Sequence, residues 1–184
     1  MNLRRATSGD LDFMVRVDLE DEGVTSGYRD GWQDADFAEH REQIGAFLSD
    51  LDKGCFVADS GAETSIGLVM WRIRNLKIES LAPEHLFSQI ETALPPSGIF
   101  CEIFQLWVAP SFRRKGIGSI LKKAVEAHAI ERGVEMIYTH TEERNLYVLE
   151  FNKRLGYREV RRGRIWDDEV RVSLVKDLRL PGDA

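Results

Sequence analysis

The chain has 184 residues, of which 43% are hydrophobic and 30% are charged, and its formal net charge is −6. This length and composition predict a single globular domain with a well-solvated surface. A pI near 5.3 argues against nucleic acid as the main partner, and no stretch is apolar enough to cross a membrane. Two cysteines, Cys55 and Cys101, are too few for a disulfide framework or a metal site, and the first residues lack a secretion signal. We therefore expect a cytoplasmic protein without a metal.

The first half of the chain predicts helices followed by a hairpin. Residues 7–10 resemble a helix N-cap, and apolar side chains then recur at helical spacing. Four further elements are expected: a helix over 37–48, strands over 55–58 and 66–73, and a short helix over 83–94 inside an insert at 75–99.

The second half predicts alternating strands and helices. The expected elements are a strand over 99–108, a helix over 118–132, a strand over 134–140, a helix over 145–155, and an antiparallel pair over 157–166 and 170–175. This order combines local antiparallel pairing with one strand–helix–strand crossover. It indicates an α/β (α+β) fold with a mixed sheet.

A basic, glycine-containing junction separates the strand at 99–108 from the helix at 118–132. Arg113, Arg114 and Lys115 run directly into Gly116-Ile117-Gly118. The first amides of a helix lack internal partners and carry partial positive charge, and glycine lets the backbone approach a bulky anion. This pattern favours a phosphate site. The alternative is a tight turn with a solvated basic helix start.

The two common nucleotide motifs do not fit this junction. Nothing here matches the P-loop, and the dinucleotide fingerprint would require glycine where the sequence has Leu121. Instead, Arg113-x-x-Gly116-x-Gly118 resembles the acetyl-CoA motif of the GNAT superfamily of N-acetyltransferases. A second match lies in the segment NLYVLEFNKRLGY and consists of Asn145, Phe151, Gly156 and Tyr157. Together the two motifs cover roughly residues 100–160.

The resemblance implies a GNAT-like, mostly antiparallel central sheet flanked by helices. It divides the single domain (1–184) into an acceptor-side half (1–99), an acetyl-CoA-binding core (100–160) and a C-terminal strand pair (157–178). It also implies transfer of an acetyl group from acetyl-CoA to a primary amine by direct attack. The expected cofactor-binding residues are Leu106, Trp107, Val108, Arg113, Arg114, Lys115, Gly116, Ile117, Gly118, Ser119, Asn145 and Asn152.

The same resemblance suggests a catalytic base. Glu102 stands inside an apolar run, at a strand position where some family members carry the base. Its alternative is a strand-edge or solvent-facing carboxylate. The family's usual tyrosine, which lies by the leaving thiolate, aligns with Asn152. An amide can hydrogen-bond sulfur but cannot protonate it, so we expect water to protonate the thiolate unless Tyr28 or Tyr157 is recruited.

Several residues carry weaker signals. Lys122 and Lys123 read as a solvated helix face or as outer contributors to the anion site, and His140 as a polar strand end or a border of the site. Tyr28 and Trp32, with the acids at 20–22, match an acceptor-side loop or a solvated helix end.

Two rival functions stay open: a non-catalytic acyl-CoA-binding or regulatory module, and an acyltransferase for longer chains. The sequence does not identify the acceptor amine, and it leaves a homodimer open.

Overall fold

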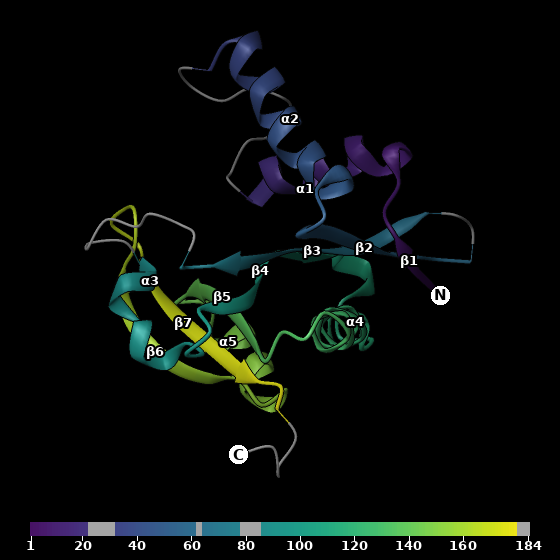
Figure 1. The fold of residues 1–184 in the computed structure, drawn as a ribbon. Coiled ribbons are helices and arrows are strands. Elements are labelled where there is room, and N and C mark those ends of the chain that lie inside the picture. Colours follow the sequence, from purple (N-terminus) through teal and green to yellow (C-terminus); the bar gives the residue numbers. More distant parts are fainter. Residues whose placement is uncertain (22–31, 62–63, 78–85, 180–184) are drawn as a thin grey trace. The chain divides into compact units, whose positions relative to one another are not determined.

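The computed structural model describes residues 1–21, 32–61, 64–77 and 86–179, and all structural statements concern these residues (Figure 1). The chain divides into two compact units. Unit 1 comprises Met1–Arg72 and Phe104–Val125, and unit 2 comprises Ile73–Ile103 and Glu126–Ala184.

Unit 1 begins with strand β1 and two helices. Its elements are β1 (Asn2–Arg5), the short 3-10 helix η1 (Ser8–Asp10), α1 (Leu11–Asp21), α2 (Asp34–Ser49), β2 (Lys53–Asp59) and most of β3 (Ser65–Asn75). The end of β4 (Ile99–Val108), the 3-10 helix η3 (Pro110–Phe112) and the first half of α4 (Ile117–Glu131) also belong to it.

Unit 2 contains the remaining elements. These are α3 (Leu86–Gln89), the 3-10 helix η2 (Glu91–Ala93), the start of β4, the end of α4, β5 (Met136–Glu142), α5 (Leu146–Arg154), β6 (Arg158–Arg164) and β7 (Val170–Asp177).

The strands follow the order β1-β2-β3-β4-β5-β7-β6. Strands β1 and β2, β2 and β3, β5 and β7, and β6 and β7 pair antiparallel, whereas β4 and β5 pair parallel through the register Cys101↔Ile137. Because parallel neighbours need a crossover connection, α4 links β4 to β5. The expected mixed, mostly antiparallel sheet with one strand–helix–strand crossover is confirmed.

The core of unit 1 lies between its strands and the first two helices. Helices α1 and α2 lie on one side of β2 and β3, and α4 lies on the other (Figure 1). The buried cluster under α1 and α2 consists of Met14, Val17, Ile44, Phe47, Cys55, Val57, Leu68 and Met70. Its strand members alternate in sequence, as expected for one face of a sheet.

Unit 2 has its own core, built around aromatic side chains. The centre of the Phe87 ring on α3 lies 5.0 Å from the centre of the Phe100 ring and 5.1 Å from that of the Tyr138 ring, both in edge-on geometry. The remaining buried members of this cluster are Leu86, Ile90, Leu94, Met136 and Val175. Part of the 75–99 insert, the helix α3, therefore contributes to this core.

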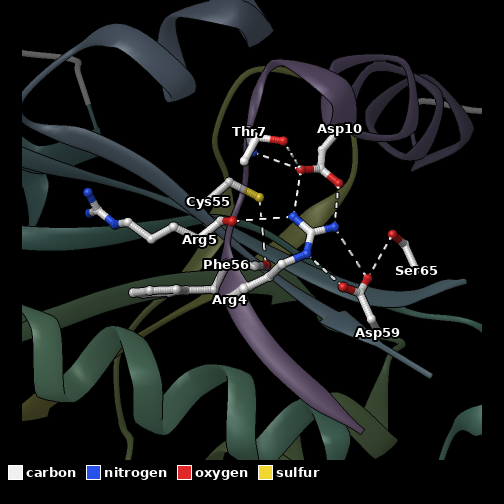
Figure 2. Close-up of polar contacts among 8 residues, drawn as sticks. All are labelled: Arg4, Arg5, Thr7, Asp10, Cys55, Phe56, Asp59 and Ser65. Carbon is white, nitrogen blue, oxygen red and sulfur yellow. Dashed lines mark hydrogen bonds and ion pairs between the residues drawn. The ribbon is translucent and has the colours of Figure 1, made fainter. Parts of the chain in front are cut away.

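Strand β1 is joined to the start of α1 by a charged network (Figure 2). The Arg4 guanidinium donates to Asp10 Oδ2 and Oδ1 at 2.7 and 2.8 Å, and to Asp59 Oδ2 at 2.6 Å. Asp10 also accepts from the backbone N–H of Thr7 at 2.7 Å and closes a capping box. Ser65 Oγ donates to Asp59 at 3.1 Å. The network fixes β1, the beginning of α1 and the end of β2 to one another.

Both cysteines are buried and free of disulfides. Burial raises the pKa of the Cys55 thiol to about 12 and that of Cys101 well above its usual range. Among the described residues, no group of three or more His, Cys, Asp or Glu side chains is arranged to hold a metal ion. None of the helices in that part of the chain is long and apolar enough to span a membrane.

The elements agree closely with the sequence predictions, with one addition. The strand expected over 99–108 is β4, and the helix expected over 118–132 is α4, which begins one residue earlier. Strand β1 was not predicted, because its sequence NLRR has no apolar alternation. Residues 83–85, the expected start of the insert's helix, lie outside the described residues.

Candidate functional site

The junction between β4 and α4 forms an irregular turn with two left-handed residues. After Pro110–Phe112, the backbone takes φ values of 60° at Arg114 and 83° at Gly116. A Cβ at Gly116 would meet nothing within 4 Å, so glycine is required there by conformation rather than by space. The carbonyl of Gly116 accepts from the N–H of Ile120 at 3.1 Å, which makes Gly116 the first residue of the helical hydrogen-bond pattern.

The first turn of α4 leaves its amides available. Within the described part of the chain, the N–H groups of residues 116–119 form no hydrogen bond. This turn also contains no acidic residue. The unpaired amides and the helix dipole together make a site that attracts an anion, and the open space at Gly116 lets a bulky group approach.

The three cations before the helix are exposed. Arg113 Nε donates to the carbonyl of Val108 at 2.9 Å and so ties the loop to the end of β4. The ammonium of Lys115 lies 5.0 Å from the centre of the Phe112 ring. Within the described residues, Arg113, Arg114 and Lys115 form no ion pair, so their charge adds to the field at the helix start.

The two lysines in the next turn of α4 differ from each other. Lys123 is exposed, as the solvated-face interpretation predicts. Lys122 is only 2% exposed, so the solvated-face interpretation is wrong for it, and its contribution to the anion site stays a prediction. The buried face of α4 is two residues wide at this level, because Leu121 and Lys122 both point inward.

Two aromatic side chains near the end of β4 lie on the same side of the sheet. The rings of Phe104 and Trp107 both contact the cluster under α1 and α2, at 5.0 Å from Phe47 and 5.7 Å from Phe13. Residues three apart in a regular strand face opposite sides, so the alternation shifts by one residue between them, as at a β-bulge. The indole of Trp107 therefore belongs to the α1 side of the sheet.

A glycine in β3 lets this strand end approach closely. A Cβ at Gly67 would lie 3.1 Å from the Trp107 carbonyl oxygen and 3.2 Å from a methyl group of Leu121. Beside it, the N–H of Ala109 donates to the carbonyl of Ile66 at 2.9 Å. Sequence reasoning missed Gly67, although an isolated glycine inside a strand signals such a close approach.

Glu102 lies in the buried part of β4 within unit 2. It is 4% exposed, and its Oε2 accepts from Arg74 Nη1 at 3.2 Å. Its register partner on β5 is Tyr138, whose hydroxyl lies 3.1 Å from Ser173 Oγ. The alternative of a solvent-facing carboxylate is wrong. Arg74 was missed because it is 28 residues away in sequence, and no local pattern signals the pair.

The two asparagines of the second motif have different environments. Asn145 is exposed and caps α5, with its side-chain oxygen accepting from the N–H of Val148 at 3.3 Å. Asn152 is 1% exposed and shares the inner face of α5 with Leu149. A contact between Asn152 and the leaving sulfur stays a prediction, and the native side chain presents almost no surface for it.

The other candidate proton donors and acceptor residues are placed as follows. Tyr157 is buried and donates to Glu126 Oε1 at 3.3 Å; burial, together with the charge of Glu126, raises its pKa well above the usual range. Half-buried His140 packs edge-on against Trp166 at 5.1 Å. The Trp32 ring lies 5.5 Å from His40, which pairs with Asp18 at 3.3 Å. Tyr28 and Glu22 lie outside the described residues.

Comparisons with known proteins agree with this geometry. The family model of the Acetyltransferase (GNAT) family matches residues 18–157, more than half of the chain. No curated protein matches the chain significantly.

Solved structures share the fold at low sequence identity. Arabidopsis thaliana NAA60 in complex with acetyl-CoA is 19% identical, with a TM-score of 0.69 over 96% of this chain and 97% of that one. The ribosomal-protein-S18-alanine N-acetyltransferase of Escherichia coli is 12% identical, with a TM-score of 0.63 over 99% and 96% of the two chains. Spermidine/spermine N-acetyltransferase SpeG of Vibrio cholerae is 17% identical, with a TM-score of 0.62 over 96% and 92%. The chain thus belongs to the GNAT acetyltransferase family.

Proposed function

We propose that this protein binds acetyl-CoA and transfers its acetyl group to a primary amine. The observation that carries the proposal is the start of α4, where the four consecutive amides at 116–119 have no hydrogen-bond partner among the described residues and lie beside three exposed cations. A diphosphate matches such a site in charge and in hydrogen-bonding capacity. When bound, acetyl-CoA supplies an acetyl thioester, which an amine can attack.

The loop before α4 and the end of β4 bind different parts of the coenzyme. The amides of Gly116, Ile117, Gly118 and Ser119 hold the diphosphate, and Arg113, Arg114 and Lys115 add attraction from their exposed positions. Backbone groups of Leu106, Trp107 and Val108 hold the amide-bearing arm of the coenzyme, as an added strand would. The shift in alternation between Phe104 and Trp107 supports this role, because a bulge disrupts regular pairing and re-aims backbone groups. Asn145, which is exposed at the start of α5, adds a hydrogen bond to the coenzyme.

Glu102 acts as the general base in this proposal. An alkylammonium with a pKa of about 10.4 is only about 0.04% neutral at pH 7, so the attacking amine must lose a proton. A positioned carboxylate, directly or through a water, is typically worth about 10²- to 10⁴-fold. Backbone amides near Val108 stabilise the charge that develops on the carbonyl oxygen. The departing thiolate takes its proton from water.

The test is a panel of amines assayed by mass spectrometry with acetyl-CoA. The structural neighbours include N-acetyltransferases named for spermidine and for a protein alanine, so the panel contains spermidine, alanine-initiated peptides and a lysine-containing peptide. We expect an increase in mass by one acetyl group on at least one of them. Failure to acetylate any amine, with the coenzyme shown to bind, would contradict the proposed activity.

The second candidate is a non-catalytic acyl-CoA-binding module. Asn152 in the usual tyrosine position, buried to 1%, favours it. The substitution Glu102→Gln separates the two functions. An enzyme loses turnover while its affinity for coenzyme A, measured by calorimetry, is retained. A binding module has no turnover to lose.

A further inference from the structure

Glu102 and Arg74 form a buried ion pair in unit 2. Their side chains are 5% and 15% exposed, and Arg74 Nη1 lies 3.2 Å from Glu102 Oε2. On its other side, the guanidinium lies 4.9 Å from the centre of the Phe87 ring. Phe87 in turn packs against Phe100 and Tyr138. The guanidinium is thus fixed between a carboxylate and an aromatic cluster.

Three groups in the described part of the chain lie next to Glu102, and they differ in charge. Tyr138 is its register partner on β5, Cys101 precedes it on β4, and Arg74 approaches from β3. Burial raises the pKa of both Tyr138 and Cys101 well above the usual range, and the negative charge of Glu102 raises each further. Both groups are therefore neutral at physiological pH. Of the three, Arg74 is the one that carries a charge.

We propose that Arg74 is a positioning residue for the reaction, which holds Glu102 ionised and oriented so that it can accept the proton of the acceptor ammonium. The proposal rests on the proposed function of Glu102 as the base. In the step concerned, the N–H bond of the ammonium breaks, its electron pair stays on nitrogen, and an O–H bond forms on Glu102. Arg74 touches neither the amine nor the coenzyme in this role.

The physical reason is the competition between burial and charge. Transfer of a carboxylate out of water favours its protonated, uncharged form, which cannot act as a base. A guanidinium at 3.2 Å favours the ionised form, and the buried aromatic surroundings strengthen this attraction. The hydrogen bond to Oε2 also restricts rotation of the carboxylate, so the same contact sets both its charge and its orientation.

The first experiment needs no acceptor. The titration of Glu102 is followed by ¹³C NMR of the carboxyl carbons in protein labelled at glutamate, with the signal assigned by its loss in Glu102→Gln. In Arg74→Met the midpoint is expected to lie above that of the native protein, because the opposite charge is gone. In Arg74→Lys, which keeps the charge, it is expected to stay near the native value. An unchanged midpoint in Arg74→Met overturns the proposal.

The second experiment measures the pH dependence of kcat/KM with the amine of the panel that is acetylated fastest. In Arg74→Met the acid limb of the profile is expected to move upward, so that the loss of kcat/KM relative to the native protein grows as the pH falls. The variant should recover most of this loss at pH 9, where the carboxylate is ionised without help. An equal loss at every pH indicates a structural role and overturns the proposal.

A matched control lies two residues earlier on the same strand. Arg72 also places its guanidinium over an aromatic ring, 5.3 Å from the centre of Phe104. We expect Arg72→Met to keep the native pH profile. Arg74→Gln serves as a second neutral variant, and near-UV circular dichroism verifies that each variant has the native packing before its titration is compared.

The outcomes distinguish this proposal from the proposed function. If Glu102→Gln abolishes turnover and Arg74→Met leaves the midpoint and the profile unchanged, Glu102 is the base and Arg74 has no positioning role. If Glu102→Gln keeps full turnover, the base assignment fails, and the positioning role fails with it. If the panel yields no acetylated amine, the activity fails, and the NMR titration still decides whether Arg74 controls the charge of Glu102.

Discussion

Two strand-to-helix junctions in unit 1 are basic, and they differ in how their charges are satisfied. At the β1–α1 junction, Arg4 is held by the carboxylates of Asp10 and Asp59, and Asp10 also closes the capping box of η1, which runs directly into α1. At the β4–α4 junction, no acid lies in the first helical turn and the amides of residues 116–119 have no partner in the described structure. The first junction contains its own anion, and the second lacks one.

This difference teaches how to tell a structural basic turn from a binding one. Counting arginines and lysines does not separate the two junctions, because both sequences are cationic. What separates them is the presence of a carboxylate or a capping side chain within reach of the helix start. Helix α5 shows the same rule, since Asn145 caps it from within the chain. Of these three helix starts, that of α4 has no such cap, which supports the proposal that it binds a ligand.

The largest expected effect comes from adding an anion to the second junction. Gly116→Asp introduces a carboxylate among the unpaired amides and forces a side chain onto a residue with φ 83°. We expect affinity for coenzyme A to fall by about 1,000-fold, equal to ~4 kcal/mol, because at least two charge-assisted hydrogen bonds are lost. Isothermal titration calorimetry measures this change.

The control for that prediction lies at the other end of the same helix. Gly133 also has a positive φ, 69°, and open space around it. Gly133→Asp should strain the backbone similarly and leave coenzyme affinity within about twofold. Equal losses of affinity in the two variants would show that Gly116→Asp acts through the fold and not through the anion site.

The second-largest effect is expected from removing the cation at the first junction. Arg4→Met leaves Asp10 and Asp59 without their guanidinium, at side-chain exposures of 8% and 12%. We expect the free energy of unfolding to fall by about 3 kcal/mol, as when one partner of a buried pair is removed. Urea denaturation measures it. Arg16→Met breaks an exposed pair with Glu20 and should cost less than about 1 kcal/mol.

Acid should weaken the first junction in a defined pH window. The hydrogen bond from Arg4, with the further contribution of Thr7, lowers the pKa of Asp10 from 3.8 to about 2. Because the unfolded chain takes up this proton first, the stabilisation is complete above about pH 4 and is lost as the pH falls toward 2. It amounts to about 2 kcal/mol. The free energies of unfolding of the native protein and of Asp10→Asn, each measured by denaturation as a function of pH, should converge over this range. A constant difference between them would contradict the assignment.

The smallest effect concerns the exposed cations of the second junction. Arg114→Gln combined with Lys115→Gln should weaken coenzyme binding by about fivefold, or ~1 kcal/mol, because exposed charges act through water. The dependence of affinity on salt concentration should become shallower. Lys123→Gln, an exposed cation one turn further along α4, is the matched control and should change neither quantity.

Much of the fold follows from local patterns in the sequence. The apolar run at 99–108 stops at a proline, and β4 has these bounds. The glycine spacing at 116 and 118 marks the start of α4, and the two family motifs identify the chain as a GNAT protein. Strand β1 was not predicted, because its NLRR segment is held in place by the contact of Arg4 with Asp59, which is 55 residues away in the sequence.

The candidate site could be predicted less completely, because its decisive contacts join distant residues. Glu102 was found from its isolated charge in an apolar run, but its partner Arg74 has no signal in the sequence. Burial of Lys122 and Asn152 depends on how wide a face each helix packs, and a helical period does not specify that width. Local chemistry thus pointed to the candidate anion site, whereas the environment of Glu102, the proposed base, required the structure.

The enclosure of both thiols makes the chain a convenient subject for site-specific labelling. Cys55 and Cys101 are the only cysteines in the sequence, and burial keeps both protonated and shielded from alkylating reagents. A single cysteine placed at an exposed position such as Lys123 would then react alone, without prior removal of the native ones. A fluorophore attached there, beside the start of α4, would report coenzyme binding directly in solution.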